Sequence, residues 1–403
     1  MISRRAALTA GLAAAAVGGR SMAAHAAKSP PGAEIKIGNT APYSGPGSSY
    51  SVIPRFEAAY FKMINEHGGI AGHKIDFISL DDAYTPPKTV EDTRRLVEQD
   101  QVDFCFGSLG TPTNSAIAEY MNHHKVPQLF VGTGAGKWAD YKKYPWTMGF
   151  QPSYRTEAQI YAKYMLANVK DPKMGILYQN DDFGKDYPLG VRDILGANWD
   201  KIVAKSLTYE TTDATVDSQI AEMQGAGCNV LLVGAIAKFA AQAIRKVYDI
   251  QWKPMFFMTN VATSVGMVMQ PVGPEKAVGM ISTQYIKDPT DPEWNDDAGI
   301  KAWRAFMAKY LPNGDTTDAA NVFAYGAAMT MVQVLKQCDG DFSHANVMRQ
   351  AENLHNFQVP VLLPGITIST GHTDHRPIKA MQLQRWDGKT WVRFGGLIEG
   401  ANV

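Results

Sequence analysis

Short runs of β-branched and apolar residues alternate with longer amphipathic stretches along most of the chain, and this pattern limits the fold more than any other feature. The expected strands are Glu34 to Gly38, Lys74 to Leu80, Val102 to Phe106, Gln128 to Val131, Met174 to Tyr178, Ile202 to Leu207, Val230 to Val233 and Met255 to Met258. The expected helices include Val52 to Glu66, Thr89 to Asp100, Asn114 to His124, Thr156 to Asn168 and Phe239 to Tyr248. Such alternation is typical of mainly parallel sheets flanked by helices, so we expect an α/β fold.

The alternation is interrupted twice, which predicts more than one sheet. It restarts near Thr147 to Pro152, and it changes near Met280 to Thr283, before a helix-rich stretch from Asp296 to Leu354. The segment from Gly365 to Phe394 is expected to form strands around the turn Asp387-Gly388. Two α/β lobes joined by chain crossings fit this order better than one long sheet.

We expect residues 34–152 and 284–360 to form lobe 1, and residues 153–283 and 361–403 to form lobe 2. In open α/β sheets, ligands bind outside the carboxyl ends of the strands. The loops that follow the strands are therefore the first place to look for a site.

The N-terminus is expected to be a signal peptide that covers residues 1–26. Two arginines follow Ser3, a weakly apolar run extends from Ala6 to Gly19, and Ala24-His25-Ala26 places small residues where a signal peptidase reads them. Cleavage is expected before Ala27. The arginine pair indicates the twin-arginine route, but the general secretory route stays open because Ala7 stands where the twin-arginine signal usually has Phe.

The rest of the chain carries no sign of a membrane anchor. The first cysteine is Cys105, so no lipoprotein cysteine follows the leader, and no run of eighteen or more apolar residues could span a bilayer. We expect the mature protein to be free in the periplasm.

Charge and cysteine content exclude several classes of protein. Without Arg4, Arg5 and Arg20, the mature chain has three fewer basic residues than its 39 acidic ones, and near-neutrality argues against nucleic acid as a partner. The three cysteines are scattered with no C-x-x-C spacing, so the sequence predicts neither a zinc site nor a disulfide framework. At most one bridge could form.

Enzyme motifs fail when they are tested residue by residue. The run Gly132 to Lys137 looks like a phosphate loop, but Val131 and Trp138 occupy the positions of its first glycine and its Ser/Thr. Neither G-x-G-x-x-G after the first strand nor G-x-S-x-G is present. We therefore expect no catalytic residues and no cofactor.

Clustered polar residues also favour structural roles. His123-His124 close a helix, where imidazole complements the dipole, and His372 and His375 lie in a polar loop, so no metal site is expected. The adjacent pairs Asp81-Asp82 and Asp181-Asp182 favour solvated or hinge positions over acid/base chemistry.

A series of short motifs recurs in a fixed order across the chain. These motifs are Ser44-Gly45-Pro46, Tyr50, Asn65 to Gly72, Asp81 to Tyr84, Gly107 to Thr111, Gly132 to Gly136, Asn180 to Gly184 and Gln242 to Arg245. In order and spacing the chain resembles the leucine/isoleucine/valine-binding protein family over essentially its whole mature length. The resemblance implies the type I periplasmic-binding fold, with two lobes, three hinge crossings and a cleft that closes on a ligand, which an ABC importer then receives.

The resemblance also implies where a ligand carboxylate would bind. In the family, backbone N–H groups and hydroxyls of the loops after the third and fourth strands hold it, and the matching positions are Gly110, Thr111, Thr133 and Ala135. Small residues at helix N-termini suit an anion independently of the resemblance. Thr111, just before Pro112, could equally serve only as a helix cap, and the two roles are compatible.

Further residues are expected to form the walls of the cleft. Tyr50 and Phe183 match family aromatics that pack over the ligand from opposite lobes, and Tyr154 and Ile236 fall near other lining positions. A core role is the competing interpretation for Phe183 and Tyr154. Leu109 and Asn260, in the loops after the third strand and after Met258, complete the expected ligand-binding set.

The chain departs from the family in two places. A disulfide of lobe 1 would join the positions of Tyr84 and Gly110, which are not cysteines, and the family's acidic residue for an amino acid's ammonium has no counterpart between Phe256 and Ser264. Asp182 is the nearest replacement. Since a buried ammonium without a countercharge is costly, an aromatic or aliphatic acid is favoured, with branched-chain amino acids as the alternative.

The expected partners are a small carboxylate and a membrane permease, and the protein is expected to be a monomer. A ligand sensor of the same fold and an α/β enzyme are the competing functions.

Overall fold

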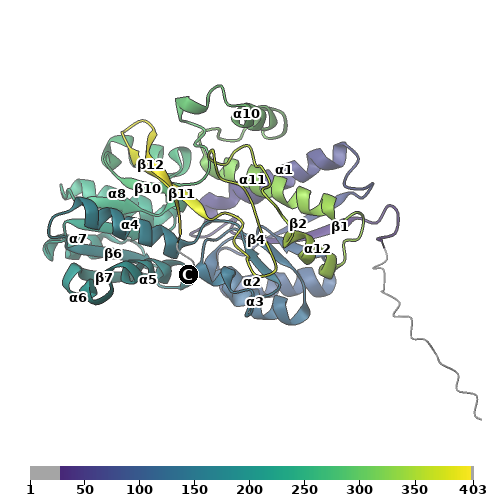
Figure 1. The fold of residues 1–403 in the computed structure, drawn as a ribbon, viewed down its shortest axis with the longest axis horizontal. Coiled ribbons are helices and arrows are strands. Elements are labelled where there is room, and N and C mark those ends of the chain that lie inside the picture. Colours follow the sequence, from purple (N-terminus) through teal and green to yellow (C-terminus); the bar gives the residue numbers. More distant parts are fainter. Residues whose placement is uncertain (1–27, 401–403) are drawn as a thin grey trace, which may run out of the picture.

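The computed structural model describes residues 28–400, which contain two separate β-sheets side by side (Figure 1). The expected signal peptide and cleavage site lie outside the described residues. Within them, no helix is long and apolar enough to cross a membrane. The α/β architecture expected from the alternating pattern is confirmed.

The first sheet has five parallel strands in the order β2-β1-β3-β4-β5. Its strands are β1 (Ile35–Ala41), β2 (Ile75–Asp81), β3 (Phe104–Phe106), β4 (Gln128–Val131) and β5 (Thr147–Gly149). The connecting helices are α1 (Val52–Glu66), α2 (Pro86–Arg94) and α3 (Thr111–His124). The loops after β3 and β4 therefore open at the same edge of the sheet.

The second sheet has seven strands in the order β12-β11-β10-β9-β8-β6-β7. Its strands are β6 (Met174–Gln179), β7 (Val203–Tyr209), β8 (Val230–Gly234), β9 (Met255–Met258), β10 (Ile281–Gln284), β11 (Ala380–Trp386) and β12 (Trp391–Glu399). Its main helices are α4 (Tyr154–Asn168), α5 (Asp182–Leu195), α6 (Trp199–Ile202), α7 (Asp217–Gly225), α8 (Ala237–Asp249) and α9 (Gln270–Val272). Strands β6 to β10 are parallel, and β11 runs antiparallel to β10 and forms an antiparallel hairpin with β12 at the edge.

The helices that follow β10 return to the first sheet. They are α10 (Ala298–Tyr310), α11 (Ala319–Gln337) and α12 (His344–Ala351), and α11 packs against α1 (Figure 1). The rings of Phe56 and Phe306 lie 4.8 Å apart, and that of Tyr325 lies 5.9 Å from Phe56. We call the first sheet with α1–α3 and α10–α12 lobe 1, and the second sheet with α4–α9 lobe 2. The residue boundaries assigned from the sequence stay a prediction.

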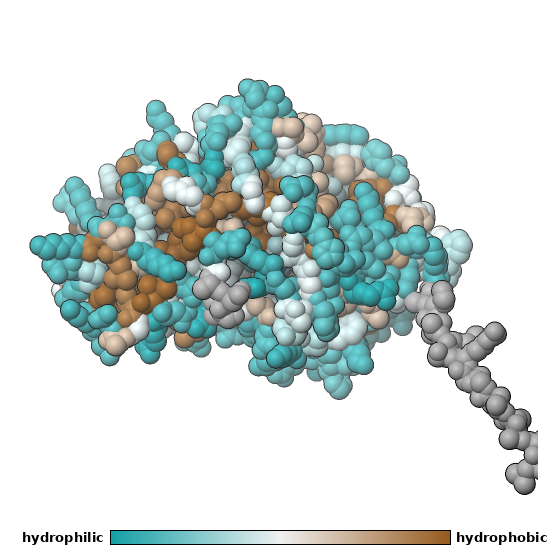
Figure 2. Space-filling model, in the orientation of Figure 1, coloured by the Kyte–Doolittle hydropathy of each residue, from teal (hydrophilic) through white to brown (hydrophobic). Residues whose placement is uncertain are grey.

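Apolar surface is distributed unequally between the lobes. Among residues 28–400, all the exposed large hydrophobic side chains belong to lobe 2: Leu166, Leu189, Tyr248, Val278, Val392 and Leu397. On the face shown in Figure 2, hydrophobic residues gather toward the half that holds the second sheet.

The three cysteines, Cys105, Cys228 and Cys338, are buried and free. The structure therefore contains none of the bridges that the sequence left open. In place of the family's disulfide, the ring of Tyr84 packs against Gly110, where an added Cβ would lie 2.6 Å from Cε2 of Tyr84. A bulky aromatic thus fills the space between these two positions.

Candidate functional site

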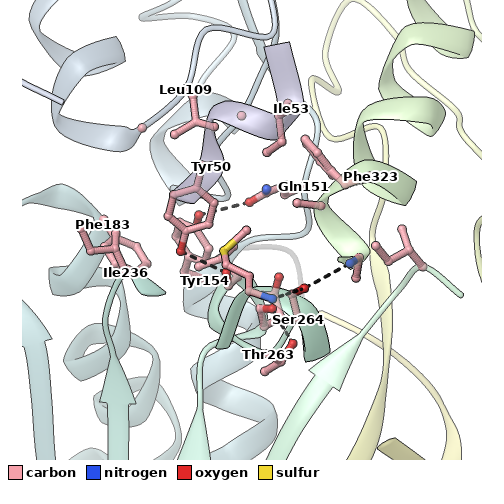
Figure 3. A pocket seen from close by; sticks show the side chains of 18 of the residues that line it. Tyr50, Ile53, Leu109, Gln151, Tyr154, Phe183, Ile236, Thr263, Ser264 and Phe323 are labelled. Atoms are coloured by element: carbon pink, nitrogen blue, oxygen red, sulfur yellow. Dashed lines mark hydrogen bonds between the residues drawn. The ribbon is translucent and has the colours of Figure 1, made fainter. Parts of the chain in front are cut away.

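A pocket lies between the lobes, beyond the carboxyl ends of strands from both sheets (Figure 3). It has about 740 Å³ of space between atoms, including the solvent at its mouth. Its wall is formed by loops after strands, by the crossing segments and by the start of α11. The lining residues are Tyr50, Ile53, Tyr84, Leu109, Gly110, Thr111, Gly132, Gln151, Tyr154, Phe183, Ile236, Asn260, Val261, Thr263, Ser264, Met267, Gln284, Tyr285, Ile286, Ala319, Ala320 and Phe323.

None of these lining side chains is that of an Asp, Glu, Lys, Arg or His. Aromatic rings come from both lobes, and the rings of Tyr154 and Phe183 meet edge to face at 4.9 Å. A pocket of this composition favours an apolar ligand body with a few hydrogen-bonding groups.

The structure brings most of the expected ligand-binding residues to this pocket. Those on its wall are Tyr50, Leu109, Gly110, Thr111, Tyr154, Phe183, Ile236 and Asn260. Thr133 and Ala135 instead line a neighbouring, more polar cavity. The Thr133 hydroxyl is 2.6 Å from that of Thr111, and the Ala135 N–H donates to Thr133 Oγ1 at 3.2 Å. Thr133 therefore lies behind the pocket wall and is hydrogen-bonded to the lining residue Thr111.

The N-terminus of α3 meets the pocket at Gly110 and Thr111. Gly110 has a φ of 101°, a left-handed conformation that favours glycine, and the ring of Tyr84 leaves no room for a side chain. Its own N–H donates to the Gly132 carbonyl at 3.3 Å. The first turn of any α-helix has N–H groups without intrahelical partners, so this end of the pocket favours an anion.

Tyr50 joins the two lobes across the pocket. Its hydroxyl donates to the Val261 carbonyl at 3.1 Å and accepts from the Ala237 N–H at 3.0 Å. Burial raises the pKa of the phenol well above its usual value, so it stays protonated. Because Tyr50 belongs to lobe 1 and both partners to lobe 2, the structure is a closed arrangement of the lobes.

Asp182, expected as the replacement countercharge for an ammonium, does not line the pocket. Its carboxylate bonds Lys137 at 2.9 Å and Ser115 at 3.1 Å, both in lobe 1. Burial alone would raise its pKa, but these partners hold the pKa below its usual value. The Gly136 N–H donates to nearby Asp186 at 2.7 Å, and burial raises the pKa of Asp186 to about 6. Both aspartates therefore link the lobes.

Two buried carboxyl groups behind the pocket wall were not identified by the sequence analysis. The first is Glu157 of α4, which accepts the Asn260 N–H at 2.8 Å and hydroxyl donors from Tyr161, Tyr187 and Thr283. Burial raises its pKa despite these donors. No sequence signal separates Glu157 from the other polar residues of its helix. Its role is to fix the turn that carries Asn260.

The second is Asp318, which caps α11. It accepts from Ser264 Oγ at 2.7 Å and from the Ala320 N–H at 2.9 Å, and both of these residues line the pocket. Burial raises the pKa of its carboxyl. An Asp directly before the apolar run of α11 is a cap signal that could have placed it. Asp318 is therefore a carboxyl group at the edge of the pocket.

Other lining residues also come from segments that carried no motif. Gln151 lies on the crossing between β5 and α4, and Gln284 to Ile286 lie where the chain leaves β10. Phe323 faces the pocket from α11 (Figure 3). Only the approach of the two lobes makes these residues neighbours.

A further buried carboxyl lies under the loop that follows β3. Glu57 of α1 is 0% exposed, and neither of its oxygens has a hydrogen-bond partner among the described residues. A Cβ added at Gly107, two residues before Leu109, would lie 2.7 Å from Glu57 Oε1. Burial holds the pKa of Glu57 well above its usual value.

The histidines occupy structural positions. His123 and His124 lie in the last turn of α3, as expected. His375 is buried, with Nδ1 2.9 Å from the Thr147 carbonyl oxygen and Nε2 3.0 Å from Glu352 Oε1. Among residues 28–400, no three His, Cys, Asp or Glu side chains gather as a metal site.

Comparisons with known proteins agree with this architecture. Over 314 residues the chain is 23% identical to the Leu/Ile/Val-binding protein homolog 1 of Brucella abortus, covering 75% of this chain and 78% of that protein. A branched-chain amino acid ABC transporter protein from Thermus thermophilus, with bound valine, superposes with a TM-score of 0.81 at 13% identity, over 92% of this chain and 98% of that one. A fatty acid ABC transporter substrate-binding protein from Thermomonospora curvata superposes with a TM-score of 0.77 at 18% identity, over 93% of this chain and 95% of that one.

The family model described as periplasmic binding protein matches residues 34–390. This match covers both lobes and every strand of the first sheet. The chain belongs to the periplasmic binding protein family and has the type I periplasmic-binding fold of its leucine/isoleucine/valine-binding branch.

Proposed function

We propose that the protein binds a small aromatic or aliphatic carboxylic acid in the pocket between its lobes and delivers it to the permease of an ABC importer. The observation that carries this proposal is a pocket whose lining side chains are all uncharged. The N-terminus of α3, with Thr111, offers a place for the carboxylate. The rings of Tyr50, Tyr154 and Phe183 offer flat walls for an apolar tail.

The same observation argues against an ammonium group in the ligand. A buried cation needs a countercharge, and Asp182 is already bound to Lys137 and Ser115 outside the pocket. A tail without charge meets no such cost. The fatty acid ABC transporter substrate-binding protein of similar fold is consistent with a ligand whose tail carries no charge.

Binding of a branched-chain amino acid is the second candidate, and Asp318 favours it. This carboxyl accepts a hydrogen bond from Ser264, which lines the pocket, and is a candidate countercharge for an ammonium. The names of the relatives and the valine-bound structure point in the same direction.

The setting of the proposed function is the periplasm. We propose export through the leader of residues 1–26 by the twin-arginine route, a monomeric mature protein, and binding without catalysis. Sequencing the N-terminus of the mature protein tests the leader, since an intact leader on functional protein would exclude it.

Calorimetric titration with benzoate and with leucine tests the ligand class. Tighter binding of benzoate supports the proposal, whereas tighter binding of leucine favours the alternative. The variant Asp318→Asn serves as control: it should weaken leucine alone if Asp318 holds the ammonium. Mass spectrometry of the ligand retained through purification would identify the compound directly.

A further inference from the structure

The turn that follows β9 forms part of the lobe 2 wall of the pocket, and several of its polar groups are bonded within the protein. The Asn260 carbonyl accepts from Thr263 Oγ1 at 2.7 Å, and the Val261 carbonyl accepts from the Tyr50 hydroxyl at 3.1 Å. Ser264 Oγ donates to Asp318 and accepts from the Ala319 N–H at 3.1 Å. These bonds leave the turn with little freedom to rearrange.

The side chain of Asn260 carries a buried donor that is not bonded to any described residue. It lines the pocket, is 7% exposed, and its Nδ2 has no hydrogen-bond partner among the described residues. A buried donor without a partner is destabilising, so a native site that keeps one has a reason for it. The backbone N–H of the same residue is held by Glu157 at 2.8 Å, which keeps Asn260 at the pocket.

We propose that Asn260 determines specificity by donating a hydrogen bond to an uncharged oxygen of the ligand. The ligand is then a carboxylic acid with a second oxygen, a carbonyl or a hydroxyl, on the part that faces lobe 2. This inference rests on the proposed function, which places the carboxylate at α3 in lobe 1.

The chemistry of the wall supports a neutral acceptor. An amide N–H₂ pairs with a carbonyl or hydroxyl oxygen, whereas an ammonium has only donors and cannot satisfy the unpaired Nδ2. No lining residue supplies the charge that an ammonium requires. Sites built around a hydrogen bond discriminate strongly against analogues that lack the matching group, because the buried donor is then left unpaired.

Matched pairs of acids test the inference. The first pair is 4-methyl-2-oxopentanoate and 4-methylpentanoate, and the second pair is 4-hydroxycinnamate and cinnamate. Leucine is the ligand that carries an ammonium, and all five compounds are titrated by calorimetry. In at least one pair the acid with the second oxygen should bind about tenfold tighter. In the variant Asn260→Leu the ratio of the two affinities within that pair should fall to about one.

The variant Asn260→Asp is the second test, because it introduces a carboxylate of the same size. It should weaken the oxygen-bearing acid and strengthen leucine, and melting curves of both variants verify folding. Equal affinities within both pairs for the wild type, a difference that survives in Asn260→Leu, or leucine as the tightest wild-type ligand would each overturn the inference. Absence of binding by all five compounds would instead overturn the proposed function itself. The wild-type comparison decides even if a variant does not fold.

Discussion

Replacing Tyr50 with Phe should weaken ligand binding by opening the lobes. The ring stays in place, but two hydrogen bonds are lost: the one that its hydroxyl donates to the Val261 carbonyl and the one that it accepts from the Ala237 N–H. A buried hydrogen bond contributes about 1 kcal/mol net, so the closed state should lose about 2 kcal/mol relative to the open one. Because ligand binding is coupled to closure, Kd should rise roughly 30-fold.

Calorimetry measures this change, and small-angle X-ray scattering with and without ligand measures closure. Tyr43→Phe is the matched control, because it loses one hydroxyl bond of 2.7 Å, to Ser79 within lobe 1, and should leave Kd almost unchanged. Unchanged affinity and unchanged ligand-induced compaction in Tyr50→Phe would refute the reasoning. Equal losses in both variants would show that destabilisation of lobe 1 is the cause.

Three further predictions follow from named contacts. Thr111→Val keeps the volume but removes the hydroxyl that meets Thr133, so binding should weaken by about 1 to 3 kcal/mol in calorimetry, and unchanged affinity with unchanged stability would remove Thr111 from the site. Asp182→Asn breaks an exposed ion pair with Lys137, so Kd should rise less than about fivefold, and the rise should be smaller in high salt. A larger rise in Kd that does not depend on salt would contradict a role of Asp182 as an exposed ion-pair partner. Glu57 has a folded-state pKa raised above its ordinary value of 4.5, so its protonated form stabilises the fold at low pH and that stability is lost as pH rises through the raised pKa. Glu57→Gln should therefore raise the melting temperature at neutral and alkaline pH and flatten its pH dependence, and an equal or lower melting temperature at every pH would exclude this.

Local pattern predicted much of the fold because strands and helices with one buried face carry their own periodicity. The bounds of α1, Val52–Glu66, and of β4 and β9 match the expected ranges, and other strands differ by a few residues at their ends. Helix α5 was not among the helices named from the sequence. Asp181 caps it by accepting from the N–H groups of Phe183 and Gly184, and Pro188 lies inside it.

The sequence by itself determined the α/β class, because alternating strands and helices carry their own periodicity. The resemblance to a known family supplied pocket residues such as Thr111, Ile236 and Asn260, and small residues at a helix N-terminus supported Thr111 independently. Only the tertiary structure decided that Thr133 stands behind Thr111, that Asp182 bonds Lys137 outside the pocket and that the Asn260 amide has no partner. Such facts depend on distances between segments far apart in the chain, which periodicity does not encode.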